Sequence, residues 1–364
     1  MELLSVTMND GVMPRTEIEG KDNSSEDKSN YKVVCKGDMV YNSMRMWQGA
    51  NGVSNYDGIV SPAYTVLMPT EEIDNQYFAA LFKTSNLINE FRKNSQGLTS
   101  DTWNLKYPQI RPIRLCIPSL QEQNKISSFI GTLEERISKQ RQLVDSLKKY
   151  KRGVMQKVFR NMSAFSPSGF ETVRLSDIFK KASRRNSNGE IKNVITNSAE
   201  HGLIPQRDFF DKDIAVDGNT GNYYVIEYGD FVYNPRKSNT APYGPFNRYE
   251  RQEKGIISPL YTCLVLKTDI EPAYLAWYFK SDAWYRYIYD NGSQGVRHDR
   301  VSMTDDLLMG IPVIIPSKDS QIKIAKLLDC LEKRFQVELS QCEYLKTVRE
   351  IMPFSCRSYR LKGP

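Results

Sequence analysis

The sequence predicts an α+β protein, in which two repeated mixed α/β domains are separated by two long helices that form an antiparallel coiled coil. The first observation is an internal repeat. Residues 31–42 (YKVVCKGDMVYN) match residues 223–234 (YYVIEYGDFVYN), and residues 118–126 match residues 316–324 after a shift of 198. The second observation is that each copy ends in apolar residues spaced alternately four and three apart, which is the 3.5-residue period of a coiled coil.

The two apolar seams have the same register. The first seam contains Ile130, Leu133, Ile137, Val144, Leu147, Val154 and Val158. The second contains Leu328, Leu331, Phe335, Cys342, Leu345 and Met352. Two such helices in one chain most simply pack on each other in antiparallel orientation, although a coiled coil could also dimerise the protein. The basic residues Lys148, Lys149, Lys151 and Arg152 are expected on a solvated face or docking surface.

The elements of the first unit follow from turn signals and periodicity. Strands are predicted over residues 39–41, 59–60 and 64–67, a helix over 74–91, and a last strand over 113–117. Ser119 and Glu122 fit a capping box, so a long helix should begin there and run to about residue 159.

The second unit repeats this order from about residue 171, with an aromatic helix over residues 272–287 and a strand over 311–315. The copies differ at their start. The second opens with residues 173–178 and about twenty more before Val194, whereas residues 3–6 of the first copy already align with that later point. The first unit therefore lacks an opening strand and helix, or a neighbouring chain supplies them.

Composition narrows the class of protein. With 364 residues, 40% of them hydrophobic, the chain can bury two ordinary cores, and its net charge of +7 gives weak support for an anionic partner. The six cysteines show no C-x-x-C spacing and are expected to be reduced thiols. No segment approaches the roughly 20 apolar residues that span a bilayer, so a soluble, cytoplasmic protein is expected.

No catalytic constellation is recognisable. The sequence has no G-x-x-x-x-G-K-[ST] phosphate loop and no G-x-G-x-x-G loop after a strand. His201 and His298 are the only histidines and lie far apart, which argues against a zinc site or a histidine-based triad. The segment 234–236 (NPR) has only the start of an amino-methyltransferase motif. We therefore expect no catalytic residue, metal or bound cofactor.

Loops rich in Arg, Asn, Gln and aromatic residues occur at matching positions in both copies. Arg can make two hydrogen bonds to guanine, and Asn or Gln can do the same to adenine. The candidate DNA-binding residues of the first unit are Arg45, Trp47, Gln48, Asn51 and Gln96. Those of the second unit are Arg236, Lys237, Asn239, Gln294, Arg297 and Arg300. Ordinary polar surface loops are the alternative interpretation.

These motifs together resemble a known family. Each copy carries G-D-x-V-Y-N and S-P-x-Y, followed by P-S-x-x-x-Q-x-K-I and a heptad helix. This arrangement resembles the DNA specificity subunit of type I restriction-modification systems, and residues 121–159 look like the central spacer helix of that family. The resemblance implies two target-recognition domains that read the halves of a bipartite double-stranded DNA site, with the helices setting the gap between them.

The resemblance also implies partners. Methyltransferase (modification) subunits would bring S-adenosylmethionine, and a motor-nuclease (restriction) subunit would bring ATP and Mg²⁺, so that the chain directs methylation and cleavage without catalysing either. The alternatives are a coiled-coil adaptor whose globular modules bind protein, or a truncated specificity subunit without function.

The predicted boundaries follow the repeat. The first target-recognition domain, truncated at its N-terminal side, covers residues 1–118, and its spacer helix covers 119–160. A linker over 161–170 leads to the second domain over 171–316. The second spacer helix covers 317–352, and a tail covers 353–364.

Overall fold

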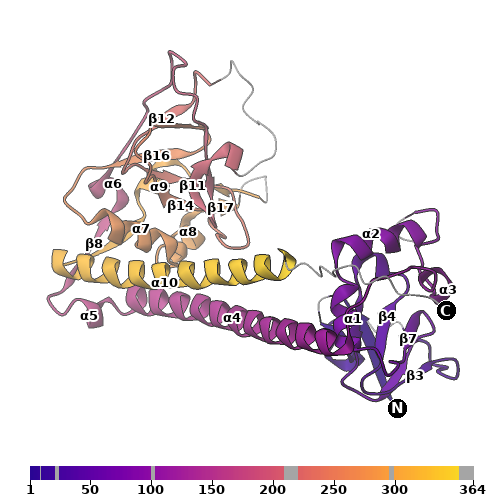
Figure 1. Cartoon of the computed structure of the whole chain (residues 1–364). Helices are drawn as coiled ribbons and strands as arrows, with labels where there is room; N and C mark the ends of the chain where they lie inside the picture. Colours follow the sequence, from indigo (N-terminus) through magenta and orange to yellow (C-terminus); the bar gives the residue numbers. More distant parts are fainter. Residues whose placement is uncertain (9, 21–23, 100–102, 209–219, 295–298, 352–364) are drawn as a thin grey trace. The chain divides into compact units, whose positions relative to one another are not determined.

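The computed structural model describes all residues except 9, 21–23, 100–102, 209–219, 295–298 and 352–364 (Figure 1). The chain forms two compact units. Unit 1 comprises Met1–Gln142 and Ser340–Pro364, and unit 2 comprises Leu143–Leu339. Each unit combines a mixed α/β domain with part of both long helices, α4 (Leu120–Arg160) and α10 (Lys318–Ile351). The predicted α+β fold class is confirmed.

The described residues of unit 1 form two small sheets covered by short helices. Its strands are β1 (Glu2–Thr7), β2 (Gly11–Pro14), β3 (Lys32–Val34), β4 (Met39–Asn42), β5 (Asn51–Val53), β6 (Gly58–Val60) and β7 (Tyr64–Leu67). Its helices, besides α4 and α10, are η1 (Arg15–Glu17), η2 (Met46–Gln48), α1 (Asn75–Leu81), α2 (Ser85–Asn94) and α3 (Tyr107–Ile110). The sheets have the orders β2-β1-β6-β3 and β5-β4-β7.

Unit 2 has the same architecture with more strands. These are β8 (Phe170–Arg174), β9 (Phe179–Lys181), β10 (Ile195–Ser198), β11 (Gly202–Pro205), β12 (Tyr224–Ile226), β13 (Phe231–Tyr233), β14 (Phe246–Arg248), β15 (Gly255–Ile257), β16 (Thr262–Leu266), β17 (Ser293–Gln294), β18 (Val301–Ser302) and β19 (Pro312–Pro316). The short helices are α5 (Met162–Phe165), α6 (Leu175–Ile178), η3 (Gln206–Asp208), α7 (Pro272–Lys280), α8 (Tyr285–Asn291) and α9 (Asp305–Met309). An aromatic core includes Phe246 stacked on Phe279 with ring centroids 3.9 Å apart.

Two predicted helices are each divided in the structure. Residues 74–91 form α1 and most of α2, because Thr84 adopts an extended conformation between them and donates its hydroxyl to the Leu81 carbonyl. Residues 272–287 likewise form α7 and the first three residues of α8, with the break beginning at Ser281. In both cases the break turns the second helix so that its apolar side chains, such as Leu87 and Ile288, reach the core.

The glutamine of the repeated P-S-x-x-x-Q motif has the same structural role in both units. The Gln123 amide accepts the backbone N–H of Asp74 at 3.0 Å and donates to the Pro118 carbonyl at 3.0 Å. The Gln321 amide accepts the N–H of Glu271 at 2.8 Å and donates to the Pro316 carbonyl at 2.8 Å. Both glutamines are buried. The motif therefore fixes the start of each long helix against its domain.

The G-D-x-V-Y-N motif is also structural. The carboxylates of Asp38 and Asp230 each accept a backbone N–H three residues earlier, at 2.9 Å. The side-chain oxygens of Asn42 and Asn234 each accept the N–H two residues later, at 3.0 and 2.9 Å. These bonds shape the turn before the strand and the loop after it, so each loop leaves its strand in the same way.

The long helices pack through their predicted seams in antiparallel orientation. In unit 1 the Leu133 and Ile137 side chains cluster with Leu345, and Arg349 bonds Glu134 at 3.0 Å. In unit 2 Lys151 pairs with Glu332 at 2.5 Å. The predicted antiparallel coiled coil is confirmed. From Glu134 to Lys151 the contacts move toward the C-terminus of α4, while their partners move toward the N-terminus of α10, from Arg349 to Glu332.

The two ion pairs are related by the repeat. A shift of 198 residues turns Glu134 into Glu332 and Lys151 into Arg349, so each unit makes the same contact with the helices exchanged. Lys151 also lies 4.5 Å from the ring centroid of Phe335. The expectation that Lys151 belongs to a solvated face or docking surface is therefore wrong, because its ammonium is engaged inside the helix pair.

The predicted strand over residues 113–117 is absent from unit 1. In unit 2 the corresponding segment is β19, which pairs along its length with β8. Residues 113–117 alternate between half-buried and exposed side chains, as a strand would, but no described strand lies beside them. A β-strand forms only beside another strand that shares its backbone hydrogen bonds, and residues 113–117 have no such neighbour among the described residues.

Candidate nucleic-acid interface

The loop of unit 2 that follows β13 and carries Arg236, Lys237 and Asn239 lies against residues 299–301 of the same unit. Arg236 and Arg300 form an isolated antiparallel β-bridge. The Lys237 N–H donates to the Asp299 carbonyl at 2.8 Å, and the Val301 N–H donates to the Pro235 carbonyl at 2.9 Å. The structure thus brings together candidate residues that are far apart in the sequence.

The bridge produces a cationic surface with one carboxylate in it. Arg236 has a side chain that is 68% exposed, and its Nε lies 3.8 Å from the Asp299 carboxylate. The Nε of Arg300 lies 3.9 Å from the same carboxylate and has no hydrogen-bond partner among the described atoms. Lys237 is half-buried and Asn239 is exposed. A single carboxylate shared by two guanidinium groups leaves hydrogen-bonding capacity for a ligand.

Two further candidates of unit 2 are less defined. Gln294 lies in β17, where its backbone pairs with Val301 and so places it beside the bridge. Arg297 lies outside the described residues.

Unit 1 builds its candidate loop in the equivalent way. The Leu105 N–H donates to the Ser43 carbonyl at 2.8 Å, and Ser43 follows the motif asparagine as Pro235 does, whose carbonyl accepts the Val301 N–H. Gln96 pairs with Asn104 in an isolated bridge, with bonds of 3.0 and 2.8 Å, and is exposed. Arg45 is exposed as well. In both units a backbone bond to the residue after the motif asparagine therefore attaches the loop to a later segment.

Trp47 belongs to an aromatic and cationic cluster. Its ring contacts Trp103 edge to face, with centroids 5.2 Å apart, and the Arg92 guanidinium lies 5.7 Å from its centroid. The indole N–H already donates to the Met44 carbonyl at 3.1 Å. Gln48 is half-buried next to it. Trp47 can offer its ring to a ligand, but its hydrogen-bond donor is in use.

Asn51 does not belong to this surface. It lies in β5 opposite Tyr41, with a side chain that is 0% exposed, and its amide donates to the Gly49 carbonyl at 3.2 Å. The assignment of Asn51 as a DNA-binding residue is corrected, because strand pairing turns this side chain into the core. In this conformation it cannot reach a base.

The sequence analysis missed two residues of these surfaces. Arg92 projects from α2, and Asp299 lies beside Arg236 and Arg300. Arg92 lies on a helix and Asp299 is acidic, so neither is one of the basic loop residues that the sequence marks as candidates. Only the folding of distant segments brings them to the loops.

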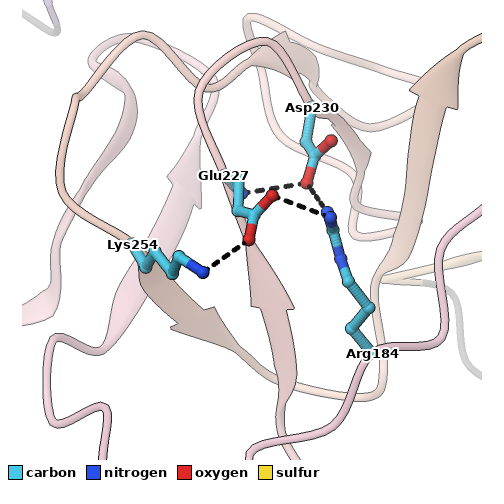
Figure 2. A network of polar contacts seen from close by, with 4 residues as sticks. All are labelled: Arg184, Glu227, Asp230 and Lys254. Atoms are coloured by element: carbon cyan, nitrogen blue, oxygen red, sulfur yellow. Dashed lines mark hydrogen bonds and ion pairs between the residues drawn. The ribbon is translucent and has the colours of Figure 1, made fainter.

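A network of charged groups supports the turn that precedes the unit 2 loop (Figure 2). Arg184 bonds both Asp230, at 2.5 Å, and Glu227, at 2.8 Å, while Lys254 bonds Glu227 at 2.9 Å. Burial raises the pKa of the Asp230 carboxyl, and the Glu227 N–H and the Arg184 charge oppose that rise. The network connects three segments of unit 2, which contain Arg184, the Glu227–Asp230 turn and Lys254, and its contacts are those of a structural clamp.

The described residues offer no metal site. No group of three or more His, Cys, Asp or Glu side chains among them is placed to hold a metal ion. None of the described helices is long and apolar enough to cross a membrane.

Comparison with known proteins places part of the chain in a family. Residues 5–149 match the family described as "Type I restriction modification DNA specificity domain". The chain is also 26% identical over 152 residues to the type I restriction enzyme HindI specificity subunit of Haemophilus influenzae. That match covers 40% of this chain and only 32% of the relative, so it spans about a third of the relative's length.

Solved structures share the fold across most of the chain. The type I restriction-modification S subunit from M. genitalium is 14% identical, with a TM-score of 0.52 over 95% of this chain and 91% of its own. A chain from a study of complex assembly and conformational transition in the type I R-M system is 17% identical. Its TM-score is 0.54, over 89% of this chain and 83% of its own. Residues 5–149 thus match the type I restriction modification DNA specificity domain, and the chain as a whole is similar in fold to structures from type I restriction-modification systems.

Proposed function

We propose that this chain is a sequence-specific DNA-binding subunit that recognises a bipartite double-stranded site, one half with each unit. The observation that carries the proposal is the duplicated loop attachment. In a chain that matches a DNA specificity domain, both units hold an Arg-bearing loop to a later segment by a backbone bond to the residue after the motif asparagine. Two equivalent reading surfaces suit two half-sites.

The side chains on these loops suit the chemistry of DNA. Arg236, Arg300 and Arg45 carry guanidinium groups that can bond guanine in the major groove or a phosphate. Lys237 suits a phosphate contact, and the exposed amides of Gln96 and Asn239 suit adenine. Gln48, Gln294 and Arg297 remain candidates for the same surfaces, and the Trp47 ring can pack against a base or sugar.

The chain would direct chemistry that other subunits perform. Methyltransferase subunits would supply S-adenosylmethionine, and a motor-nuclease subunit would supply ATP and Mg²⁺, in the cytoplasm where the DNA lies. The seams of α4 and α10 are used for packing on each other, which suits a spacer between two reading units. The chain itself would be non-catalytic.

The experiment combines methylation with DNA binding. The purified chain is expected neither to methylate nor to cut DNA, and to support site-specific methylation when mixed with a methyltransferase partner. Its affinity for DNA should fall steeply with added salt, because cationic side chains release counterions from phosphates. Methylation or cleavage by the chain alone would overturn the non-catalytic role. If the chain does not bind DNA but binds a protein partner with an affinity that salt does not change, the coiled-coil adaptor is the better assignment.

A further inference from the structure

The helices α1 and α7 are counterparts in the repeat. Each follows an acidic N-cap residue, Asp74 or Glu271, whose backbone N–H donates to the buried glutamine of the repeated motif. From these caps the two sequences run in step, as NQYFAALFK and PAYLAWYFK. Ala80 of unit 1 therefore occupies the position that Trp277 has in unit 2. A very small side chain stands where the other copy has the largest one.

In unit 2 the indole of Trp277 connects α7 to the long helix α10. The side chain is 5% exposed, and its ring N–H donates to the Asp329 carboxylate at 2.7 Å. The Lys280 ammonium lies 4.8 Å from the ring centroid. A cation over the face of an aromatic ring is attracted by the electrons of that ring. The indole thus has a carboxylate at its N–H and an ammonium over its face.

Unit 1 lacks both sides of this connection and has a cavity there. The 198-residue shift makes Gly131 of α4 the counterpart of Asp329, so neither Ala80 nor Gly131 carries the side chain that is present in unit 2. Both residues line a cavity of about 470 Å³, together with Ile130 and Lys83. This volume lies within the range of about 300–1,000 Å³ that is typical of ligand sites. The cavity therefore lies where the repeat places an indole.

The lysine that covers the indole in unit 2 has its counterpart at this cavity. Lys83, nine residues after its N-cap as Lys280 is, has a half-buried side chain. No hydrogen bond or ion pair joins its ammonium to a residue in the described part of the chain. Burial lowers the pKa of Lys83, while the nearby carboxylates of Glu134 and Asp10 oppose that change and Arg349 adds to it. A partly desolvated ammonium of this kind gains from a ring face placed against it.

The remaining wall of the cavity offers contacts of two kinds. Val53, Ala79 and Ile130 give apolar surface, against which the face of a ring can pack. Asn55 and Gln76 carry amides, whose oxygens can accept a ring N–H as Asp329 does in unit 2. The wall therefore suits a flat ring that also has a hydrogen-bond donor.

We propose that unit 1 binds a small molecule with a planar, electron-rich aromatic ring that carries an N–H, the chemical class of indole, in this cavity. The ring would take the place of the Trp277 indole, with the Lys83 ammonium over its face. We name the cavity the ring pocket, and its defining residues are Val53, Ala79, Ala80, Lys83, Ile130 and Gly131. This inference does not depend on DNA recognition.

The first test titrates the full chain with indole, without DNA, by isothermal titration calorimetry. We expect saturable binding at one site. Phenol and cyclohexanol form a matched pair, because both are six-membered rings with one hydroxyl and only phenol is aromatic. Phenol should bind about fivefold more tightly, since only its ring attracts the ammonium. Absence of saturable indole binding would refute the ring pocket, and equal affinities for phenol and cyclohexanol would overturn the aromatic class.

The second test fills the pocket from within. The double variant Ala80→Trp, Gly131→Asp rebuilds the side-chain pair of unit 2, and a Cβ added at Gly131 meets no atom within 4 Å. We expect indole binding to weaken more than tenfold while the far-ultraviolet circular dichroism of the chain stays unchanged. A folded double variant that binds indole as tightly as the parent would place the ligand elsewhere and overturn the proposal.

The third test concerns the ammonium and does not require the double variant to fold. Lys83→Met keeps a long side chain without the charge and should weaken indole binding roughly fivefold. Lys93→Met is the matched control, because Lys93 lies on α2, is 69% exposed and pairs with Glu90. Its affinity for indole should stay within about twofold of the parent. Equal affinities of the two lysine variants would contradict the position assigned to the ring beneath Lys83.

Discussion

The backbone of Arg236 pairs with that of Arg300 in an isolated antiparallel bridge, and both guanidinium groups lie within 4 Å of the Asp299 carboxylate, at 3.8 and 3.9 Å. The loop after the motif strand of unit 2 is thus held by a segment from near the end of the domain. This relationship makes the two arginines parts of one surface, and it makes Arg236 the most direct residue with which to test DNA reading.

Arg236→Ala is expected to relax or abolish recognition of one half-site and to leave the preference for the other intact. A guanidinium that bonds one base in two places contributes about 1–3 kcal/mol of discrimination. Competition binding with each half-site scrambled in turn measures this. Lys149→Ala, on the exposed face of α4, is the control and should leave sequence preference unchanged. Identical preferences for Arg236→Ala and parent at both half-sites would remove Arg236 from the reading surface.

The helix pair is expected to set the spacing between half-sites. One heptad is inserted after Gln140 in α4 and another after Cys342 in α10. These two points face each other, because Gln140 lies six residues after Glu134 and the second insertion lies the same distance before Arg349, its partner. Whole heptads preserve the apolar seam of both helices. The insertion lengthens the pair by about 10 Å, so the preferred gap should increase by about three base pairs. The preferred gap is measured by selecting bound DNA from a library in which the two half-sites are separated by gaps of different length. A preferred gap equal to that of the parent would argue against a ruler.

The Arg184 clamp is expected to stabilise unit 2 in a pH-dependent way. Arg184→Ala leaves the buried Asp230 carboxylate without its cation, which should cost about 1–2 kcal/mol at pH 7, given the partial exposure of Arg184. Burial already raises the pKa of Asp230, and losing Arg184 raises it further. The cost should therefore shrink as the pH falls toward about 4 and the carboxyl becomes protonated.

Urea unfolding of the Arg184→Ala variant at several pH values gives this cost directly. Lys254→Ala is the matched control, because it removes only the contact to the partly exposed Glu227 and should cost less than about 0.5 kcal/mol. A cost for Arg184→Ala that is constant from pH 4 to pH 7 would contradict the role assigned to Asp230.

The cysteines are expected to divide into two classes of reactivity. Burial raises the pKa of the Cys263 thiol to about 12, so almost no thiolate forms at pH 8. Cys342 is also buried, whereas Cys35, Cys116 and Cys330 are exposed. Iodoacetamide at pH 8 should modify the exposed three first, and Cys263 only after unfolding, as read by peptide mass spectrometry. Modification of Cys263 in the native chain at the rate of Cys35 would be the contrary result.

Local patterns in the sequence were sufficient for much of the fold. The 3.5-residue period predicted both long helices and their antiparallel packing, and the Ser119–Glu122 capping box forms as expected, with Glu122 accepting the Ser119 N–H at 3.1 Å. The repeated motifs predicted two units of one kind, and their hydrogen bonds are indeed duplicated around Gln123 and Gln321. Periodicity and capping depend on neighbours within a few residues, so a single sequence contains them.

Other features depended on distant segments and were decided only by the tertiary structure. Residues 113–117 have the pattern of a strand, but a strand exists only where a partner supplies hydrogen bonds, and none of the described strands does so. The sequence predicted that Asn51 lies in an exposed loop, but Asn51 lies in β5, where pairing with β4 buries its side chain. The contact of Arg236 with Arg300 follows from the path of the whole domain. The sequence by itself determined the repeat, the seams and the motif turns, whereas strand partners, burial and the membership of each surface depended on which remote segments the fold brought together.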